Sequence, residues 1–269
     1  MATSGISFKS SSAALAKTMA SLHTGICLIQ EPWLQGGSVK GLSGIGRLFR
    51  DPSRCEPRAC ILVKECDAIL MPIWCNKDLA GIKVELPEEH KAVRQVVVAS
   101  AYFPYDSQEI PQPARVAELI AYCHEKGLPL LLGCDANSYH IVCRSSDTNA
   151  RGEALLQYLV PTDLMILNKG NDLTFVNAVR SRAVIELTHC SREILQYLRK
   201  WRVAKEASLL DHTCIKFEWF SEMSTAKSLK YKSVADMEKS GRILGQAIRL
   251  AYESSCSLNV PKAKQGAPW

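Results

Sequence analysis

The chain has 269 residues, of which 47% are hydrophobic and 22% charged, with a formal net charge of +6; these values indicate a globular protein with one large α/β domain. No apolar stretch reaches the roughly 18–20 residues of a membrane span and no signal-like segment is present, so we expect an intracellular protein with no membrane partner and no secretion. The 11 cysteines are odd in number and form no Cys-x-x-Cys pair, which argues against a disulfide scaffold and against structural zinc.

The first half of the sequence predicts a helix followed by several sheet strands. Leu15, Met19 and Leu22 recur at helical spacing behind a serine run suited to a cap, and the apolar run at 25–29 is predicted to be a buried strand. Glycine-rich residues 36–46 are predicted to form a loop. The further strands expected before residue 104 are 59–63, 68–73, 82–86 and 96–103.

The second half predicts alternating helices and strands. A helix with an apolar stripe from Val116 to Cys123 is expected to end near Gly127 and to lead into a strand at 128–134. This mixed order favours two sheets packed face to face with helices outside, rather than a regular βαβ winding. Further helical segments are predicted at 152–159 and 194–198, and further strands at 164–167, 184–187 and 213–219.

The C-terminal part is predicted to be a separate basic segment. Residues 220–269 hold eight Lys or Arg against four Asp or Glu, and an amphipathic helix is expected at 234–252. A basic tail suits phosphate backbones, although charge bias of this size also occurs on a solvated helix face. We therefore expect an α/β domain over residues 1–219 and a basic helical tail over 220–269.

Polar side chains follow apolar strands, where loops commonly project catalytic groups. Glu31 comes directly after the first buried strand, and its carboxylate suits a hard cation such as Mg²⁺. Asp135 and Asn137 follow the strand at 128–134; a carboxylate can take a proton from water, and an amide can donate to a phosphoryl oxygen. Taken singly, each is equally explained as a solvated loop residue or a local turn.

A second group of candidates lies near the last strand. Asp211 and His212 precede it, and an imidazole with a near-neutral pKa can protonate or stabilise a leaving oxygen while the carboxylate reaches a metal. Glu186 lies inside an otherwise apolar strand, where a buried acid needs a partner. His212 is the candidate partner, because a carboxylate behind an imidazole fixes its tautomer; alternation of Glu186 into solvent is the other interpretation.

Seven short motifs occur along the chain in a fixed order. They are LIQEPW at 28–33, SAYFP at 100–104, LGCDANS at 132–138, RGE at 151–153, TF at 174–175, VIELT at 184–188 and SLLDH at 208–212. Together they resemble the endonuclease domain of jockey-like non-long-terminal-repeat retrotransposons. Its relatives include the apurinic/apyrimidinic endonucleases and pancreatic-type deoxyribonucleases. The likeness runs from about residue 7 to residue 269.

The resemblance implies a fold and an activity. The fold is an α/β two-sheet β-sandwich flanked by helices, the four-layer endonuclease/exonuclease/phosphatase fold, over residues 1–219. The activity is metal-dependent hydrolysis of DNA phosphodiester bonds, which nicks nuclear chromosomal DNA and leaves a 3′-hydroxyl that primes reverse transcription. Residues 220–269 would lead to the reverse transcriptase domain of the parent polyprotein.

The resemblance also implies roles for individual residues. Glu31 and Asp211 bind the divalent ion, Mg²⁺ or alternatively Mn²⁺. Asp135 positions or activates the attacking water, and Asn137 and Tyr102 hydrogen-bond the scissile phosphate. The histidine that follows Asp211 stabilises the pentavalent state or protonates the leaving group.

The chain departs from the family pattern at three places. Ser7 aligns with an asparagine near the start of the family's first strand, and its shorter side chain should loosen the metal. Glu186 stands where the family usually has aspartate, and its extra methylene shifts the charge enough in principle to misplace an imidazole. Residues 143–145 replace a tryptophan-glycine pair, which puts the DNA target preference in doubt.

Three functions are compatible with these observations. The first is an active Mg²⁺-dependent DNA endonuclease. The second is a catalytically decayed retrotransposon module that acts at most as a DNA-binding or interaction protein, as the replacements at Ser7 and Glu186 would allow. The third keeps the fold and changes the substrate to a phospholipid or an inositol phosphate.

Overall fold

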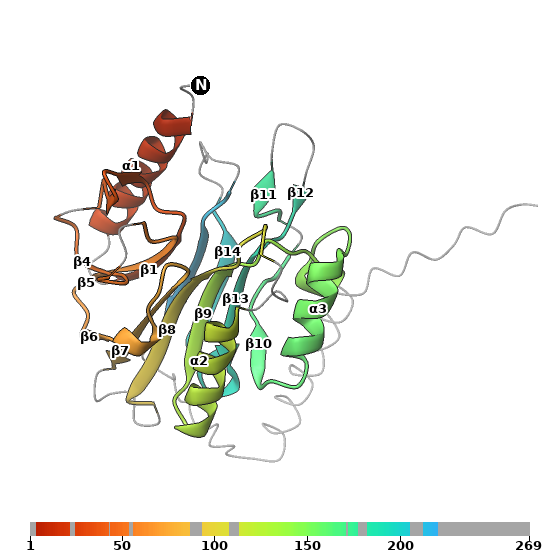
Figure 1. Ribbon diagram of the computed structural model, residues 1–269. Coiled ribbons are helices and arrows are strands. Elements are labelled where there is room, and N and C mark those ends of the chain that lie inside the picture. Colours follow the sequence, from red (N-terminus) through yellow and green to blue (C-terminus); the bar gives the residue numbers. More distant parts are fainter. Residues whose placement is uncertain are drawn as a thin grey trace, which may run out of the picture. The chain divides into compact units, whose positions relative to one another are not determined.

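A six-stranded sheet forms the centre of the fold in the computed structural model (Figure 1). Its strand order is β10-β13-β9-β8-β7-β6, and β8 and β9 run parallel while the other neighbours are antiparallel. The bounds are β6 Ala68–Leu70, β7 Leu79–Glu85, β8 Gln95–Tyr102, β9 Leu130–Asp135, β10 Leu164–Ile166 and β13 Glu186–Ser191. The structure describes residues 4–21, 25–42, 44–53, 56–86, 93–107, 113–170, 172–176, 182–204 and 212–219.

The apolar strands of this sheet are buried on both faces. Along β8, Val97 and Ala99 face one core while Val98 faces another, because successive side chains of a strand point to opposite sides. The same alternation divides Leu131 from Leu132 on β9. This double burial explains why these strands are continuous apolar runs in the sequence.

Two helices cover one face of the six-stranded sheet. They are α2 (Ala114–Glu125), which joins the parallel strands β8 and β9, and α3 (Ala150–Leu159). Val116 and Leu119 of α2 and Leu155 of α3 are buried in the core on this side. The spacing of three between Val116 and Leu119 places both on one face of the helix.

Two smaller sheets cover the other face. One has the order β1-β5-β4, with β1 Gly25–Gln30, β5 Ala59–Lys64 and β4 Arg47–Phe49; the other pairs β14 Leu198–Val203 with β15 Ile215–Trp219. Ile61 and Leu198 from these sheets share a core with Ile82 of the central sheet. Helix α1 (Ser4–Ser21) packs Met19 against Leu62 on the outer side of β5, which completes four layers.

Short elements connect these layers. They are the hairpins β2 Leu34–Gln35 with β3 Ser38–Val39 and β11 Phe175–Val176 with β12 Arg182–Ala183, and the 3-10 turns η1 Pro72–Trp74, η2 Ile141–Cys143 and η3 Arg192–Tyr197. Within the ranges that the structure describes, no helix has the length and apolarity needed to cross a membrane. The two-sheet α/β sandwich predicted from the sequence is confirmed.

Three predictions for the first part of the chain need correction. Helix α1 begins at Ser4, so the serine run lies inside the helix and does not cap it. Ser7 lies in this helix and not near the start of a strand. The strand predicted at 68–73 ends at Leu70, because Pro72 has no backbone N–H for a sheet and begins η1.

Two further predictions fail in the second half. The strand expected from Val184 begins only at Glu186, since side-chain hydroxyls of Ser145 and Thr174 already accept from the Val184 and Ile185 N–H groups. The helical segment expected at 194–198 is a 3-10 turn, followed by the unpredicted strand β14. The tail at 220–269, including its predicted helix, lies outside the described residues.

Candidate active site

Three candidate residues stand side by side across the central sheet. Asp135 is the last residue of β9, and its partners in register are Tyr102 on β8 and Glu186 on β13. Each of the three lies an even number of positions along its strand from a residue that packs against the smaller sheets. Because side chains alternate between the two faces of a sheet, all three side chains point to the face that these smaller sheets cover. The sheet register alone therefore brings a phenol and two carboxylates together at one edge.

Polar contacts between the sheets bring Glu31 to the same place. Gln30 at the end of β1 donates from Nε2 to Ser100 Oγ at 2.9 Å and to the Gly133 carbonyl at 3.3 Å. A Cβ on Gly133 would lie 2.7 Å from Leu28 Cδ1, so the missing side chain permits this close approach. Glu31 follows with φ of 47°, and its N–H donates to the Arg58 carbonyl at 2.8 Å.

His212 comes from a separate strand segment and meets the two carboxylates. It forms an isolated antiparallel bridge with Phe175, whose ring lies edge-on at 4.8 Å between centroids. Its Nδ1 hydrogen-bonds Glu186 Oε1 and lies 4.0 Å from Asp135 Oδ2. The longer glutamate side chain thus still reaches the imidazole, and the expected pairing of these two residues is present.

Asn137 is held by a tight turn after β9. It has φ of 44°, a conformation that asparagine tolerates, and its backbone N–H donates to Asp135 Oδ1 at 3.0 Å. Its Nδ2 donates to the Phe103 carbonyl at 3.1 Å. The side-chain amide is therefore fixed in orientation, with a second Nδ2 hydrogen to offer.

The Arg-Gly motif at the start of α3 braces the loops that carry these residues. The Arg151 guanidinium donates to the carbonyls of Asn137, Pro104 and Ser107 at 3.3, 3.1 and 3.4 Å, which ties the loop after β8 to the loop after β9. At Gly152 an added Cβ would lie 2.0 Å from the Tyr139 carbonyl oxygen. Glycine is required there because backbone occupies the space of a side chain.

The replaced loop residues at 143–145 are also structural. Cys143 is buried, and Ser145 Oγ donates to the Val184 carbonyl at 3.2 Å and accepts from its N–H at 2.8 Å. Arg144 between them is exposed, with φ of 75°. The loop beside the site is thus held in place by the contacts of Ser145 with Val184, and it exposes the positive charge of Arg144.

Burial and charge shift the proton affinities of the cluster. Burial, together with repulsion from Glu186, raises the pKa of Asp135 to about 7, although His212 and the Asn137 N–H work in the other direction. Burial also opposes the charged form of His212, but its hydrogen bond with Glu186 and the nearby carboxylates outweigh this effect and raise its pKa to about 8. Burial and the charges of Glu31 and Asp135 raise the pKa of Tyr102 to about 12.

The cluster is suited to a cation. One potential ligand atom from each of Glu31, Asp135 and His212 lies within 4.8 Å of the others. Within the described part of the chain, Glu186 Oε2 is buried without a hydrogen-bond partner. Excess negative charge of this kind is relieved by a divalent ion, and oxygen ligands suit Mg²⁺.

The structure brings together most of the residues singled out in the sequence. Asp211 lies outside the described residues, so its expected place beside Glu31 is not described. Sequence reasoning quoted Ser100 and Arg151 in motifs without giving either a role, and it missed Arg58, because an arginine beside an apolar strand carries no distinctive pattern. The residues that meet at the site are Glu31, Tyr102, Asp135, Asn137, Glu186 and His212.

The comparison with known families follows this geometry. Residues 96–216 match the family described as endonuclease-reverse transcriptase. This part of the chain is therefore similar in sequence to that family. No curated protein sequence matches the chain.

Several solved structures have a fold similar to that of this chain. The endonuclease domain of TRAS1, a telomere-specific non-LTR retrotransposon, is 25% identical over 79% of this chain and 92% of its own, with a TM-score of 0.62. The AP endonuclease LMAP from Leishmania major is 10% identical over 81% and 84%, with a TM-score of 0.60. An endonuclease/exonuclease/phosphatase family protein from Leptotrichia buccalis is 11% identical over 78% and 93%, with a TM-score of 0.50. The predicted four-layer fold is confirmed.

We predict that Asp135→Asn stabilises the metal-free protein at pH 8. The folded pKa of about 7 lies above the ordinary value of 3.8, so ionisation of Asp135 weakens folding increasingly as pH rises through this interval, and asparagine removes that cost. Urea denaturation in EDTA should show a gain on the order of 2–4 kcal/mol at pH 8 that shrinks towards pH 4. The exposed Asp163→Asn is the control; loss of stability in Asp135→Asn at pH 8 would contradict the prediction.

We predict that Glu186→Gln lowers the pKa of His212 from about 8 towards its ordinary 6.5, because the bonded carboxylate is lost while burial still opposes the charged form and Asp135 and Glu31 still favour it. Side-chain NMR titration of labelled histidine measures this directly, with His212→Gln to assign the signal. His189 is an internal reference, since burial lowers its pKa to about 4 and it does not contact Glu186 through any described hydrogen bond. A His212 pKa that stays near 8 would refute the assignment of its cause.

We predict that Gly152→Ala destabilises the protein by about 2–3 kcal/mol, because the new Cβ must push the Tyr139 carbonyl away. Gly127→Ala is the matched control: φ there is +60°, but no atom lies within 4 Å of an added Cβ, so the expected cost is about 1 kcal/mol. Denaturant unfolding of both variants compares the two effects. Equal losses would show that the Tyr139 loop yields readily.

Proposed function

We propose that the chain is a metal-dependent DNA endonuclease that cuts one strand and leaves a 3′-hydroxyl. The observation that carries this proposal is the meeting of Asp135, Glu186, His212 and Glu31 at one sheet edge, in a fold shared with the TRAS1 endonuclease domain. Carboxylates, an imidazole and fixed donors are the groups that an in-line displacement at phosphorus requires.

Glu31 and Asp211 are proposed to hold the divalent ion, with Mg²⁺ as the first choice and Mn²⁺ as the second. When bound, such an ion would neutralise the charge of the phosphate. Glu31 is exposed beside the buried carboxylate of Asp135, which fits a carboxylate that turns towards a shared cation.

Asp135 is proposed to take the proton of the attacking water. A general base works best when its pKa lies near the operating pH, and burial raises the pKa of Asp135 to about 7. The hydrogen bond from the Asn137 N–H to Oδ1 fixes the carboxylate. Its second oxygen, Oδ2, is then the one that faces His212.

His212 is proposed to stabilise the pentavalent state or to protonate the leaving oxygen. With its pKa raised to about 8, the imidazole is largely protonated at neutral pH. Glu186 accepts from Nδ1, which leaves Nε2 as the atom that can donate to substrate.

Asn137 and Tyr102 are proposed to donate to the scissile phosphate. The Tyr102 hydroxyl keeps its proton at all relevant pH values because its pKa is raised to about 12. Asn137 is fixed before substrate arrives by the Phe103 carbonyl and has a second Nδ2 hydrogen to donate. The Tyr102 hydroxyl donates to Glu31 in the free site, and its single proton would turn to the phosphate when substrate binds. Such preorganised donors stabilise charge as it develops.

The proposed substrate is chromosomal DNA in the nucleus, where the nick would prime the reverse transcriptase of a parent polyprotein. This proposal draws on the likeness to the TRAS1 endonuclease domain and to the endonuclease-reverse transcriptase family. The second candidate function is a decayed module that binds DNA without cutting it. The observation that supports this second candidate is that Ser7 lies in helix α1. The asparagine that orders the metal in the family lies instead near the start of a strand.

We predict that the purified chain nicks supercoiled plasmid in Mg²⁺ and not in EDTA, and that Asp135→Ala and His212→Ala each lower the rate by at least roughly 10²-fold. Asp163→Ala, an exposed aspartate variant, should retain the full rate. Extension of the nick by a DNA polymerase without prior phosphatase treatment tests for the 3′-hydroxyl. Equal nicking by wild type and Asp135→Ala would overturn the proposal, and a folded, DNA-binding wild type that never nicks would support decay.

A further inference from the structure

Arg58 forms a two-point ion pair with Asp78 beside the site. Its Nε lies 2.5 Å from Asp78 Oδ1 and its terminal nitrogen lies 2.7 Å from Oδ2, with about a quarter of each side chain exposed. This paired geometry fixes a guanidinium plane better than a single contact does. The hydrogen bond with Asp78 raises the pKa of Arg58 further, so the charge is permanent.

The Arg58 guanidinium also lies over the aromatic ring of Tyr102. The distance from its carbon to the ring centroid is 4.9 Å, which is within the range of a cation–π contact. The hydroxyl of the same tyrosine interacts with Glu31. Tyr102 is therefore fixed on its ring face by Arg58 and at its hydroxyl by Glu31.

The backbone carbonyls of Arg58 and Asp78 also hold the two site residues Glu31 and Tyr102. The Glu31 N–H donates to the Arg58 carbonyl at 2.8 Å, and the Tyr102 N–H donates to the Asp78 carbonyl at 2.9 Å. Glu31 follows a strand of the three-stranded sheet, whereas Tyr102 ends a strand of the central sheet. The ion pair thus joins the two sheets at the point where each supplies a site residue.

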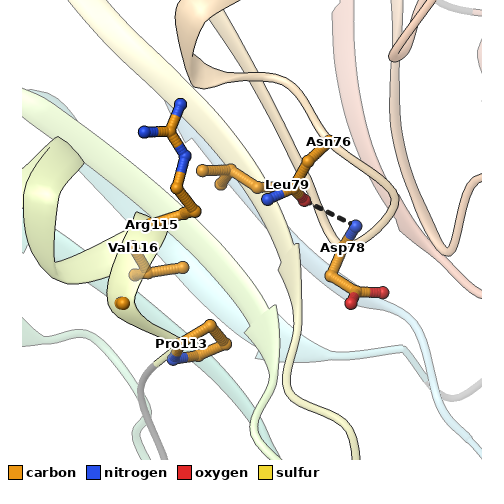
Figure 2. A pocket seen from close by; sticks show the side chains of 7 residues that line it. Asn76, Asp78, Leu79, Pro113, Arg115 and Val116 are labelled. Atoms are coloured by element: carbon orange, nitrogen blue, oxygen red, sulfur yellow. Dashed lines mark hydrogen bonds between the residues drawn. The ribbon is translucent and has the colours of Figure 1, made fainter. Parts of the chain in front are cut away.

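Asp78 has a second arginine in its neighbourhood, yet it pairs with Arg58. Asp78 and Arg115 line one pocket, whose volume is about 200 Å³. Figure 2 shows the Asp78 carboxylate directed away from Arg115. The Asp78 N–H is fixed by Asn76 Oδ1 at 2.7 Å, the bond drawn in Figure 2. Arg115 instead binds Glu118 and lies over Trp74.

We propose that Arg58, locked by Asp78, is a positioning residue: it holds the Tyr102 ring in the place from which the hydroxyl can turn its proton from Glu31 to the scissile phosphate. The inference rests on the proposed endonuclease function. It assigns Arg58 no contact with DNA: its effect passes through Tyr102. Arg58 is needed in particular because lysine, a single point charge, cannot hold both Asp78 oxygens while covering the ring.

The test is a double-variant cycle on nicking kinetics. Arg58→Met should lower kcat roughly tenfold with KM little changed, Arg58→Lys should recover part of the loss, and Asp78→Asn should resemble Arg58→Met. In a Tyr102→Phe background, Arg58→Met should have little further effect, because the hydroxyl that it positions is gone. An equal effect in both backgrounds, or a rise in KM alone that grows with salt, would overturn the proposal and indicate direct phosphate contact.

Amide hydrogen exchange supplies a readout that does not depend on activity. In Arg58→Met the amides of Glu31 and Tyr102 should exchange at least roughly tenfold faster, while the Val97 amide, bound to the Pro129 carbonyl, stays as in the wild type. Unchanged exchange at both site amides would overturn the inference. If the wild type does not nick DNA, the proposed function fails, and exchange alone then decides the role of Arg58.

Discussion

The placement of Asp135 between Tyr102 and Glu186 is the constraint on which the site depends. It follows from strand register: alternation along β9 sends Leu132 to the helix-covered core and Asp135 to the side facing the smaller sheets. A slip of one residue would exchange these faces and expose the apolar set. The packing that stabilises the sheet therefore also sends these side chains to one face, and the polar contacts of the site then fix their orientation.

The second requirement is a polar seam between the two sheets. Gln30 and Ser100 hydrogen-bond across an otherwise apolar interface, and Gly133 makes room for the approach of β1. Buried polar groups of this kind are stable only when each has a partner, and Ser100 Oγ also donates to the Ile29 carbonyl at 3.0 Å. The seam ends at Glu31, so the register of β1 against the central sheet decides whether this carboxylate reaches the cluster.

The sequence predicts those parts in which local pattern and burial agree. The strands that carry Tyr102 and Asp135 are long apolar runs, and α2 has a clear helical stripe, so their identity is local information. Strand β14 was missed because three of its six residues are cationic, which interrupts the apolar run, and because its partner β15 supplies the pairing. The late start of β13 depends on hydroxyls of Ser145 and Thr174, which lie far away in sequence. Arg58 is likewise defined only by contacts that the fold creates.

The electrostatics of the cluster bear on whether the site is active or decayed. Asp135 and Glu186 are buried close together, His212 is their one cationic partner among the described residues, and Glu186 Oε2 has no hydrogen bond there. Such an arrangement weakens folding, because buried charge that is not fully compensated is unfavourable. A neutral side chain at one of these positions would avoid that cost. A module kept only for binding would gain stability by losing one of these carboxylates. Glu186 instead keeps a carboxylate in contact with His212 despite the longer side chain, which accords with the proposed catalytic use of the cluster.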